Sequence, residues 1–531
     1  MTSTHVAPPE VKSKVLAKLP FSIGTATSAV WQGFAGSLLL FLGSLGVGWL
    51  ASSSVLIRTP LIIFARTTPA AVIVTTLMLC VGAALMLRAW LRLRQHLRDW
   101  DDASGPVLKK ALMLWVAPMM FALPLFSRDS YAYIGQGRLM QQGLNPYTNG
   151  ISALNNYFLL GPDTLWTEAP TPYGPLWLWL EHLAVLLPAG SPEIALIPFR
   201  LASLAGVILL AIYVPKLAAR HGFNPHRVTW LVVLNPILLI NFIASVHNDS
   251  LMLGLVVAGI YHASAKRPIV GILFVTASIA IKPITLIALP FVALLWAGSQ
   301  AGWVRKFGMW AATLGISTAV MAAMGAVNGL GFGWLAALQT PGTVWIWYAP
   351  VGLFSNTVGF VVGLFGSAGA AVTDVIQSMG QVVSILAVMA LAFLKISLPP
   401  ARGSQQSGGP GALGDDQRYS QLVLRRMAWA FAAVVVLSPM IQPWYMLWLL
   451  AFFAVTGIEE GWQLRTVLYL TAFFTAIALT DQLSIFPWIP VVLIRSVAIT
   501  ATLICILYVM FWDRKTRGSF LPKHDSLAHS R

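Results

Sequence analysis

The sequence predicts an all-α integral membrane protein, a polytopic bundle of about 14 transmembrane helices. Hydrophobic residues make up 57% of the 531 residues and charged residues only 10%, and the mean hydropathy is +0.75. Apolar runs of roughly 17–25 residues, long enough to cross a bilayer as a helix, recur along the chain. The runs are continuous and do not alternate with polar residues, which favours helices over a closed barrel.

The basic residues indicate how the chain is oriented in the membrane. The formal net charge is +16, but Lys and Arg lie in short segments between apolar runs, which the positive-inside rule assigns to the cytoplasmic side. This pattern indicates no nucleic-acid partner. The clearest cytoplasmic anchor is the segment 88–110, with Arg88, Arg92, Arg94, Arg98, Lys109 and Lys110. The two cysteines, Cys80 and Cys505, lie in apolar runs, so we expect neither a disulfide framework nor a metal cluster.

A polar stretch from Ser127 to Tyr147 is the exception in this apolar chain. Apolar runs near 34–52 and 69–90 precede the basic segment, so the next helix, near 109–126, is expected to run outward and to deliver the stretch to the outer face. Charge beside a bilayer is costly and usually functional, and we therefore expect an active-site loop at 127–193. Within this loop, 174–188 is expected to form an interfacial or re-entrant helix that carries Glu181 and His182.

The remaining apolar runs predict further helices whose ends are marked by basic or polar turns. They lie near 195–216, 228–245, 250–264, 268–281, 284–298, 307–326, 378–396, 427–440, 444–457, 465–481 and 488–511. Between them, 327–366 is expected to form loops and a short helix. The expected organisation is a cytoplasmic tail at 1–33, two helices at 34–107, a membrane module at 108–326, a C-terminal membrane region at 327–512 with a cytoplasmic linker at 397–424, and a basic cytoplasmic tail at 513–531.

The predicted topology collects polar and aromatic residues on the outer face. Acidic, basic and aromatic side chains together suit an anionic headgroup and a polar acceptor. Several of them lie at helix ends, where the chain can bury them against other helices. The set includes Arg128, Asp129, Arg138, Glu168, Tyr173, His247, Asn248, Asp249, Lys282, Gln442, Trp444 and Tyr445.

Each of these residues also has a purely structural interpretation. Asp129 is a favoured residue for capping the helix that follows it. The run His247-Asn248-Asp249 is equally consistent with a turn in which Asp249 caps the next helix. Lys282 before Pro283 is equally consistent with a side chain that extends to lipid headgroups. The outer tryptophans, Trp444 among them, are typical of an interfacial aromatic belt.

At this point the residues match a known family. RDSYAYIGQGRLMQQGLNPY at 128–147, followed by PTPYGPL at 170–176, resembles the polyprenol-phosphomannose-dependent α-1,6-mannosyltransferases of actinobacterial cell envelopes. The resemblance extends to the HND turn at 247–249, to Lys282-Pro283 and to QPWY at 442–445, and so covers about 110–500. The paired motifs of the loop carry most of the specificity, whereas an acidic residue at the start of an outer loop is common to the whole superfamily.

The resemblance implies a GT-C-like glycosyltransferase with a catalytic module at 108–326 and a variable C-terminal region. It implies catalysis on the outer face of the plasma membrane, a polyprenyl-phosphate-mannose donor, and a lipid-linked mannan acceptor of lipomannan and lipoarabinomannan. Two features depart from the simplest superfamily pattern. The acidic loop follows the third predicted helix and not the first, and Asp129 is followed by Ser130 and Tyr131 instead of forming an Asp-x-Asp pair. We therefore expect no metal and no other cofactor.

Transfer from a β-linked donor to give an α linkage inverts the anomeric centre, which requires one base and a stabilised leaving phosphate. We assign Asp129 as the base, on the condition that Arg128 points away, because pairing with Arg128 would lower the pKa of Asp129 and weaken it as a base. Candidate donor-phosphate ligands are Arg138, Lys282 and His247. Candidate sugar and acceptor ligands are Arg128, Tyr173, Asn248, Asp249, Gln442 and Trp444.

A flippase or transporter of a lipid-linked sugar is the competing class, because many helices and an ionisable layer fit transport as well. Transporters often contain paired repeats and interrupted helices that place charges near the bilayer midplane. The sequence shows no clear repeat, and its ionisable residues are predicted at one face. These observations favour the glycosyltransferase.

Overall fold

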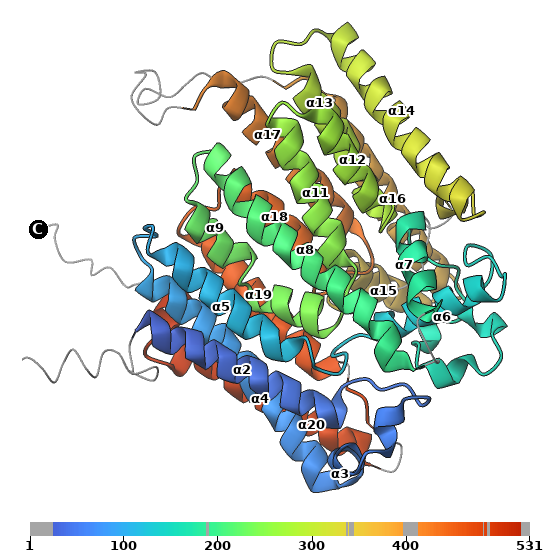
Figure 1. Ribbon diagram of the computed structural model, residues 1–531, viewed down its shortest axis with the longest axis vertical. Helices are drawn as coiled ribbons and strands as arrows, with labels where there is room; N and C mark the ends of the chain where they lie inside the picture. The colour runs from blue at the N-terminus through green and yellow to red at the C-terminus, as the bar shows by residue number, and fades with distance from the viewer. Residues whose placement is uncertain are drawn as a thin grey trace, which may run out of the picture.

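The computed structural model describes residues 25–186, 191–335, 338, 345–396, 413–481, 483–485 and 489–521. In these residues the regular structure is helical and no strand is present (Figure 1). Eight helices are long and apolar enough to cross a membrane, or nine if two consecutive helices bent by 49° form one span. The all-α multi-pass class is confirmed. The count of about 14 stays a prediction, because further apolar helices have only 10–17 residues.

The N-terminal helices form one side of the bundle. They are α2 (Ala26–Val47), α3 (Pro60–Thr67), α4 (Pro69–His96) and α5 (Ser104–Met119), with the short η1 (Val55–Arg58) between α2 and α3. Glycines allow α2 and α4 to approach closely, since a Cβ at Gly36 would lie 2.6 Å from the carbonyl oxygen of Gly82. α2 begins inside the tail expected at 1–33, and the part of that tail at 1–24 lies outside the described residues.

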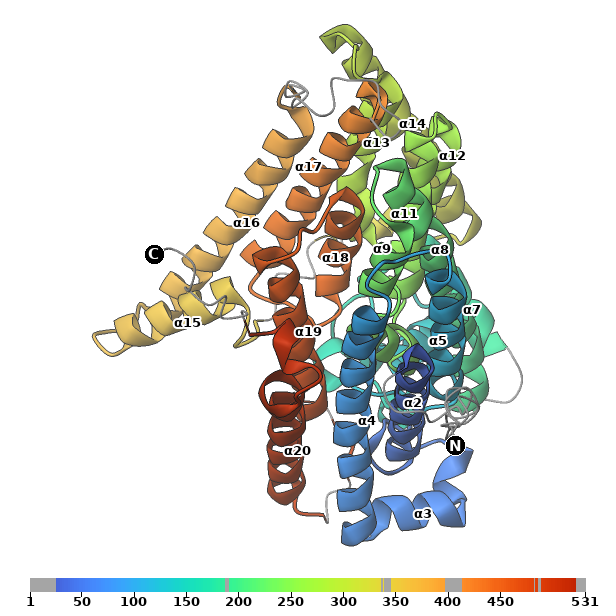
Figure 2. The same ribbon diagram turned by 90° about the vertical axis from the view of Figure 1, so that its left-hand side faces the viewer.

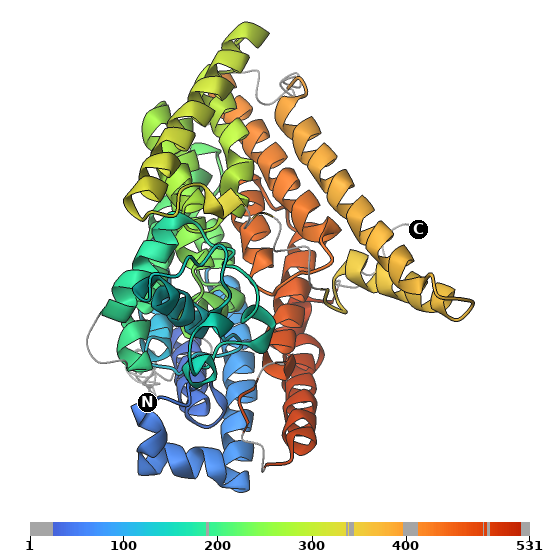
Figure 3. The same ribbon diagram turned by 90° about the vertical axis from the view of Figure 1, so that its right-hand side faces the viewer.

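The polar loop folds into short helices between α5 and α8 (Pro192–Arg220). These are α6 (Asp129–Gln141), η2 (Ile151–Ala153), η3 (Tyr157–Leu160), η4 (Thr164–Trp166) and α7 (Pro175–Leu186). Figure 3 shows them, in teal, across the near face of the molecule. Of the segment expected at 174–188, Pro175–Leu186 is helical as α7 and 187–188 lie outside the described residues; its interfacial or re-entrant placement stays a prediction. Glu181 of α7 is fully buried.

The centre of the bundle is built from interrupted helices. They are α9 (Pro225–Val232), α10 (Pro236–Leu238), η6 (Leu239–Ala244), α11 (Asp249–Ser264), α12 (Pro268–Ile279), η7 (Pro283–Ala288) and α13 (Leu289–Ala297). The single helix expected at 228–245 is instead bent by 49°, because Pro236 has no N–H to continue the ladder and Asn235 caps the next turn. The breaks before α11 and η7 coincide with the polar turns at His247-Asn248-Asp249 and Lys282-Pro283.

The C-terminal half covers the rest of the centre, and its last helices return to pack against α4. It consists of α14 (Trp303–Val327), α15 (Pro350–Gly363), α16 (Gly369–Phe393), α17 (Asp415–Leu437), α18 (Tyr445–Thr456), α19 (Trp462–Asp481), α20 (Val491–Leu507), η10 (Tyr508–Trp512) and η11 (Arg517–Ser519). Figures 2 and 3 show α15 and the adjoining end of α16 standing apart from the bundle. α17 starts within the linker expected at 397–424, of which 397–412 lies outside the described residues.

Close packing of α8 on α11 fixes the turn that contains His247. A Cβ added at Gly206 of α8 would lie 2.2 Å from the carbonyl carbon of Ser250, so only glycine allows this approach. At the same crossing, the hydroxyl of Ser203 donates to the His247 carbonyl at 3.1 Å and that of Ser250 donates to the Ser203 carbonyl at 2.6 Å. The close contact between small residues of α8 and α11 thus holds the start of α11 in place.

We predict that Gly206→Leu destabilises the protein by at least about 1–3 kcal/mol, the usual cost of overpacking a close contact. Gly308→Leu on α14 is the matched control, since a Cβ added there meets nothing within 4 Å. Thermal unfolding in detergent measures both variants. Equal unfolding temperatures for the two variants would contradict the packing role of Gly206.

Candidate active site

Asp129 is the first residue of α6 and lies at the end of a tight turn that follows α5. Phe126 adopts a left-handed conformation with φ of 60°, and the backbone N–H of Asp129 donates to the Ser127 hydroxyl at 3.1 Å. A carboxylate in the first turn of a helix is favoured by the helix dipole. The carboxylate is mostly buried but retains 19% exposure, so it combines a fixed position with access to a ligand.

His247 lies directly against this carboxylate. Its Nδ1 is 3.3 Å from Asp129 Oδ2, and its side chain is fully buried. Trp444 covers the imidazole, with ring centroids 3.8 Å apart. Val246, immediately before it, has a φ of 62°, and this tight turn joins η6 to α11. His247 is therefore held between the base candidate and an aromatic wall.

The next charged pair joins two of the helix breaks. Lys282 Nζ, before η7, lies 2.9 Å from Asp249 Oδ2, at the start of α11. The Trp448 indole N–H donates to the other carboxylate oxygen at 3.0 Å. Asp249 is fully buried, whereas the Lys282 side chain is 16% exposed. Lys282 Nζ also lies 5.7 Å from the Tyr445 ring centroid, so its charge is stabilised by a carboxylate and by an aromatic face.

Both halves of the cluster meet at one small cavity of about 70 Å³. Asp129 and Lys282 face it directly. Aromatic side chains from three parts of the chain complete its wall. The lining residues are Asp129, Ala132, Gln136, Trp166, Pro170, Pro172, Tyr173, Lys282, Trp444 and Tyr445. One carboxylate, one ammonium group and several aromatic rings around one space are suited to a polar substrate that carries an anionic group.

The environment of Asp129 favours its ionised form. Burial alone would raise the pKa of the carboxyl group, but contact with His247 and the charge of Lys282 outweigh burial and hold the pKa below its usual range. The helix that carries this carboxyl group, α6, is not among the helices that are long and apolar enough to cross a membrane. Asp129 is therefore a carboxylate at neutral pH and is able to accept a proton. The contacts with His247 and Lys282 that lower its pKa also make it a weaker base, the effect that sequence analysis expected of a pairing with Arg128.

The structure brings together most of the residues that sequence analysis selected, although their assigned roles stay predictions. Asp129, Tyr173, Lys282 and Trp444 line the cavity, with His247 and Asp249 directly behind it. Asn248 is fully buried, and no hydrogen bond to its amide side chain is found within the described part of the chain.

Three selected residues do not face the cavity. Arg128 points away from Asp129, as expected, because its guanidinium lies 3.7 Å from the Trp49 ring centroid. Arg138 follows Asp129 by nine residues in α6, which places it about 13 Å further along the helix and on the opposite side. Gln442 is half-buried and outside the lining; its carbonyl accepts from the N–H of Tyr445 at 2.9 Å. Phosphate binding by Arg138 and acceptor binding by Arg128 and Gln442 stay untested predictions.

Sequence analysis missed residues that share a helix face with the ones it selected. Gln136 lies seven residues after Asp129 and lines the same cavity, and helical spacing alone predicts this placement. Tyr133, four residues after Asp129, accepts from the N–H of Asn248 at 3.3 Å. Trp448, four residues after Trp444, donates to Asp249. A search for polar residues at helical spacing from Asp129 would have found Gln136 and Tyr133, whereas nothing in the spacing separates Trp448 from the other tryptophans.

Comparison with protein families identifies the chain. A family model described as alpha-(1->6)-mannopyranosyltransferase, N-terminal domain, matches residues 30–298, which include α2 to α13 and the Asp129, His247 and Lys282 positions. The chain belongs to this family of mannosyltransferases. A second model, described as MptB C-terminal domain, matches residues 417–507. The resemblance seen in the sequence motifs is thereby confirmed.

Curated mannosyltransferases are similar over most of the chain. A probable alpha-(1->6)-mannopyranosyltransferase of Mycolicibacterium smegmatis is 32% identical over 82% of this chain and 80% of its own length. Alpha-(1->6)-mannopyranosyltransferase A of Mycobacterium tuberculosis is 30% identical over 81% of this chain and 80% of its own. Alpha-(1->6)-mannopyranosyltransferase B of Corynebacterium glutamicum is 25% identical over 83% and 75%. These relatives support mannosyl transfer as the reaction. No solved structure matches the chain significantly.

Proposed function

We propose that the protein transfers mannose from polyprenyl-phosphate-mannose to a mannan acceptor, with inversion, and forms α-1,6 linkages of the lipomannan and lipoarabinomannan core. The observation that carries this proposal is the position of the charged cavity beside an apolar groove. A donor whose sugar phosphate is polar and whose tail is a long hydrocarbon needs both environments next to each other. Membership of the mannosyltransferase family supplies the sugar and the reaction class.

The apolar groove has a volume of about 460 Å³ and lies between η7, α16 and α17. Ile284 and Ile287 of η7 form one wall, and Leu437 and Pro439 form another. Ile284 lies two residues after Lys282. One short segment therefore contributes Lys282 to the cavity and Ile284 to the groove. The groove supports a lipid-linked donor whose phosphate binds near the Lys282 ammonium and whose tail leaves toward the lipid.

In the proposed reaction the acceptor hydroxyl attacks the anomeric carbon on the side opposite the departing phosphate. Asp129 accepts the hydroxyl proton as the new carbon–oxygen bond forms and the carbon–oxygen bond to the phosphate breaks. The polyprenyl phosphate leaves with the bonding electron pair, and Lys282 stabilises its charge. Because a phosphate ester leaves without being protonated first, the site needs no general acid, which agrees with an Asp129 that is ionised.

The buried pairs explain how the reactive groups are held. His247 orients the Asp129 carboxylate through its 3.3 Å contact and is itself fixed against Trp444. In the same way, Asp249 orients the Lys282 ammonium group through a contact of 2.9 Å between Oδ2 and Nζ. The Lys282 ammonium has three donors, so pairing with Asp249 leaves donors for a phosphate. Tyr173 and Trp444 offer aromatic faces to a sugar ring at the cavity wall.

We place the cavity on the outer face of the plasma membrane. The basic residues from Arg88 to Lys110 lie before α5 or in its first half, and Asp129 follows its end, so the two groups lie at opposite ends of an outward helix under the positive-inside rule. A lipid-linked donor supports the same face, because it is presented within the membrane. Transport of a lipid-linked sugar remains the competing function, and the transfer assay below separates the two.

The Asp129→Asn variant tests the proposed base. Asparagine keeps the size of the side chain but cannot accept the proton, so transfer should fall by about 10²–10⁴-fold, the usual contribution of general-base catalysis. Donor binding should be retained. The assay is mannose transfer by purified protein in detergent. Asp374→Asn on α16, an exposed carboxylate away from the cavity, is the matched control. Near-full activity of Asp129→Asn would show that another group is the base.

The pH dependence of the rate tests the contact with His247. Asp129 must be ionised to act, so activity falls as the pH drops through its pKa, which His247 holds below the usual range. His247→Phe keeps a ring against Trp444 but removes the contact, so the pKa of Asp129 should rise and the acid limb of kcat/KM should move to higher pH. His262→Phe, whose ring stacks on Phe274, is the control. An acid limb that stays in place, or moves to lower pH, would rule out this coupling.

A further inference from the structure

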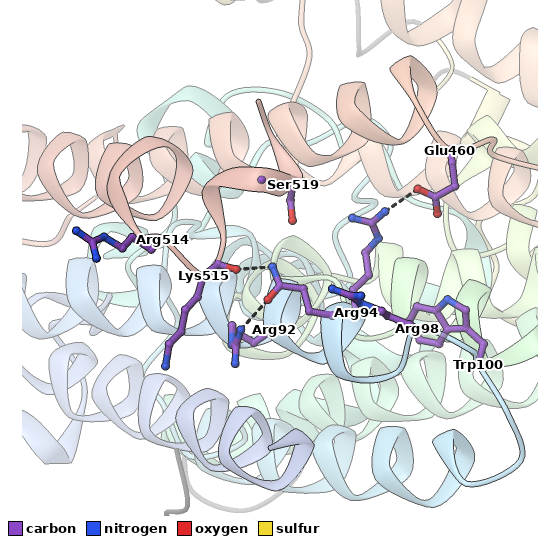
Figure 4. A pocket seen from close by; sticks show the side chains of 10 residues that line it. Arg92, Arg94, Arg98, Trp100, Glu460, Arg514, Lys515 and Ser519 are labelled. Atoms are coloured by element: carbon purple, nitrogen blue, oxygen red, sulfur yellow. Dashed lines mark hydrogen bonds and ion pairs between the residues drawn. The ribbon is translucent and has the colours of Figure 1, made fainter. Parts of the chain in front are cut away.

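A second and larger cavity lies at the opposite end of α5 from Asp129. Its volume is about 660 Å³, and segments far apart in the sequence line it (Figure 4). They are the end of α4 and the turn after it, the turn before α19, and the segment that follows η10. The charged residues in the lining are Arg92, Arg94, Arg98, Glu460, Arg514 and Lys515. The mechanism of mannosyl transfer uses none of them.

Most of this positive charge is not neutralised by the protein. Glu460 is the one carboxylate of the lining, and two arginines already pair with it: Arg94 at 2.6 Å and Arg227 at 3.2 Å. Within the described ranges, no ion pair joins Arg92, Arg98, Arg514 or Lys515 to a carboxylate. Like charges gathered around a hollow repel one another, and an anionic ligand in the hollow removes that repulsion.

Hydrogen bonds organise the walls of the cavity. Arg92 donates to the side-chain oxygen of Gln95 at 2.7 Å, and the Gln95 amide donates in turn to the carbonyl of Lys515. Beside them, Arg88 pairs with Asp513 at 2.7 Å. Figure 4 shows Arg92 and Lys515, and dashed lines mark the two hydrogen bonds that link them and so join two walls. The end of α4 and the segment after η10 are therefore held together before any ligand binds, which lowers the entropy cost of binding.

The surroundings of the cavity indicate the depth of lipid headgroups. Just before Arg514, Trp512 is 65% exposed and Tyr508 is 53% exposed, and exposed Trp and Tyr are typical of the membrane–water interface. The preceding turns of α20 expose apolar side chains, including Ile504. A bound molecule with its phosphate among the arginines and its hydrocarbon along α20 would satisfy both surfaces at once.

We propose that this cavity binds the phosphate-bearing headgroup of an anionic membrane lipid. The cavity matches the basic pockets between transmembrane helices that recognise anionic headgroups. It lies at the end of three helical segments, it has an excess of guanidinium groups, and aromatic side chains typical of the interface lie beside it. Arginine is suited to this role because its planar fork binds phosphate oxygens in pairs. The bound lipid joins α4 to the segment after α20, and the inference does not depend on the identity of the mannose donor.

Native mass spectrometry of delipidated protein in detergent tests the proposal. The probes are phosphatidylglycerol and, as a neutral control, phosphatidylcholine. Phosphatidylglycerol should bind at least tenfold more tightly. The Arg98→Gln/Arg514→Gln variant should weaken its binding by on the order of 30-fold, because each basic residue near an anionic headgroup contributes a factor of about five.

Matched controls distinguish a specific site from general charge attraction. The Arg305→Gln/Lys306→Gln variant removes the same charge from the start of α14 and should bind phosphatidylglycerol like the unaltered protein. Unchanged unfolding temperatures show that both double variants are folded. If the Arg98→Gln/Arg514→Gln variant unfolds, the single Arg98→Gln variant replaces it. Equal binding of the two lipids, or equal losses in the two variants, would overturn the proposal.

Soluble phosphates separate the two possible sources of the ligand. Inorganic phosphate and glycerol 3-phosphate carry the same charged group without acyl chains. At equal concentrations, neither should displace phosphatidylglycerol if the chains lie along α20. Displacement by either one at those concentrations would assign the cavity to a soluble phosphate ester and contradict the assignment to a lipid.

Discussion

The ion pair between Lys282 and Asp249 is the interaction on which the candidate site depends. It joins two helix breaks inside an apolar bundle, at a distance of 2.9 Å and with Asp249 fully buried. Leaving either charge alone in such a place would cost several kcal/mol, roughly 3–5 by analogy with other buried pairs. The start of α11 is therefore held beside η7, and His247, two residues before Asp249, is held beside Asp129. One neutralised pair thus fixes both Lys282, the proposed phosphate ligand, and His247, which contacts the proposed base.

This constraint explains why the central helices are short. Breaks at His247-Asn248-Asp249 and at Lys282-Pro283 turn backbone and side chains toward a common point. The long helices around them form the frame, and close glycine contacts, such as Gly206 of α8 against α11, fix the positions of the short helices. The segment η7, which follows the break at Lys282-Pro283, also lines the apolar groove.

The all-α class, the polar loop and most helix positions follow from the sequence, since long apolar runs and isolated charges are local signals. Asp129 was selected because a carboxylate beside a membrane is costly, and it does line the cavity. The pairing of Lys282 with Asp249 was not predictable, because it depends on how distant helices cross. Trp448 was missed for the same reason, being one of many tryptophans until its N–H is seen at the carboxylate of Asp249. The bend at Pro236 was not predicted, because the long apolar run around this proline favoured a single helix.

The central claim is that Asp129 and Lys282 support inverting transfer from a lipid-phosphate donor. The most direct measurement incubates purified protein with polyprenyl-phosphate β-mannose and a synthetic mannoside, and determines by NMR the position and anomeric configuration of the new linkage. The account predicts an α-1,6 product that forms from the lipid-linked donor and does not form from a sugar nucleotide. A β-linked product, or transfer from the sugar nucleotide alone, would contradict it.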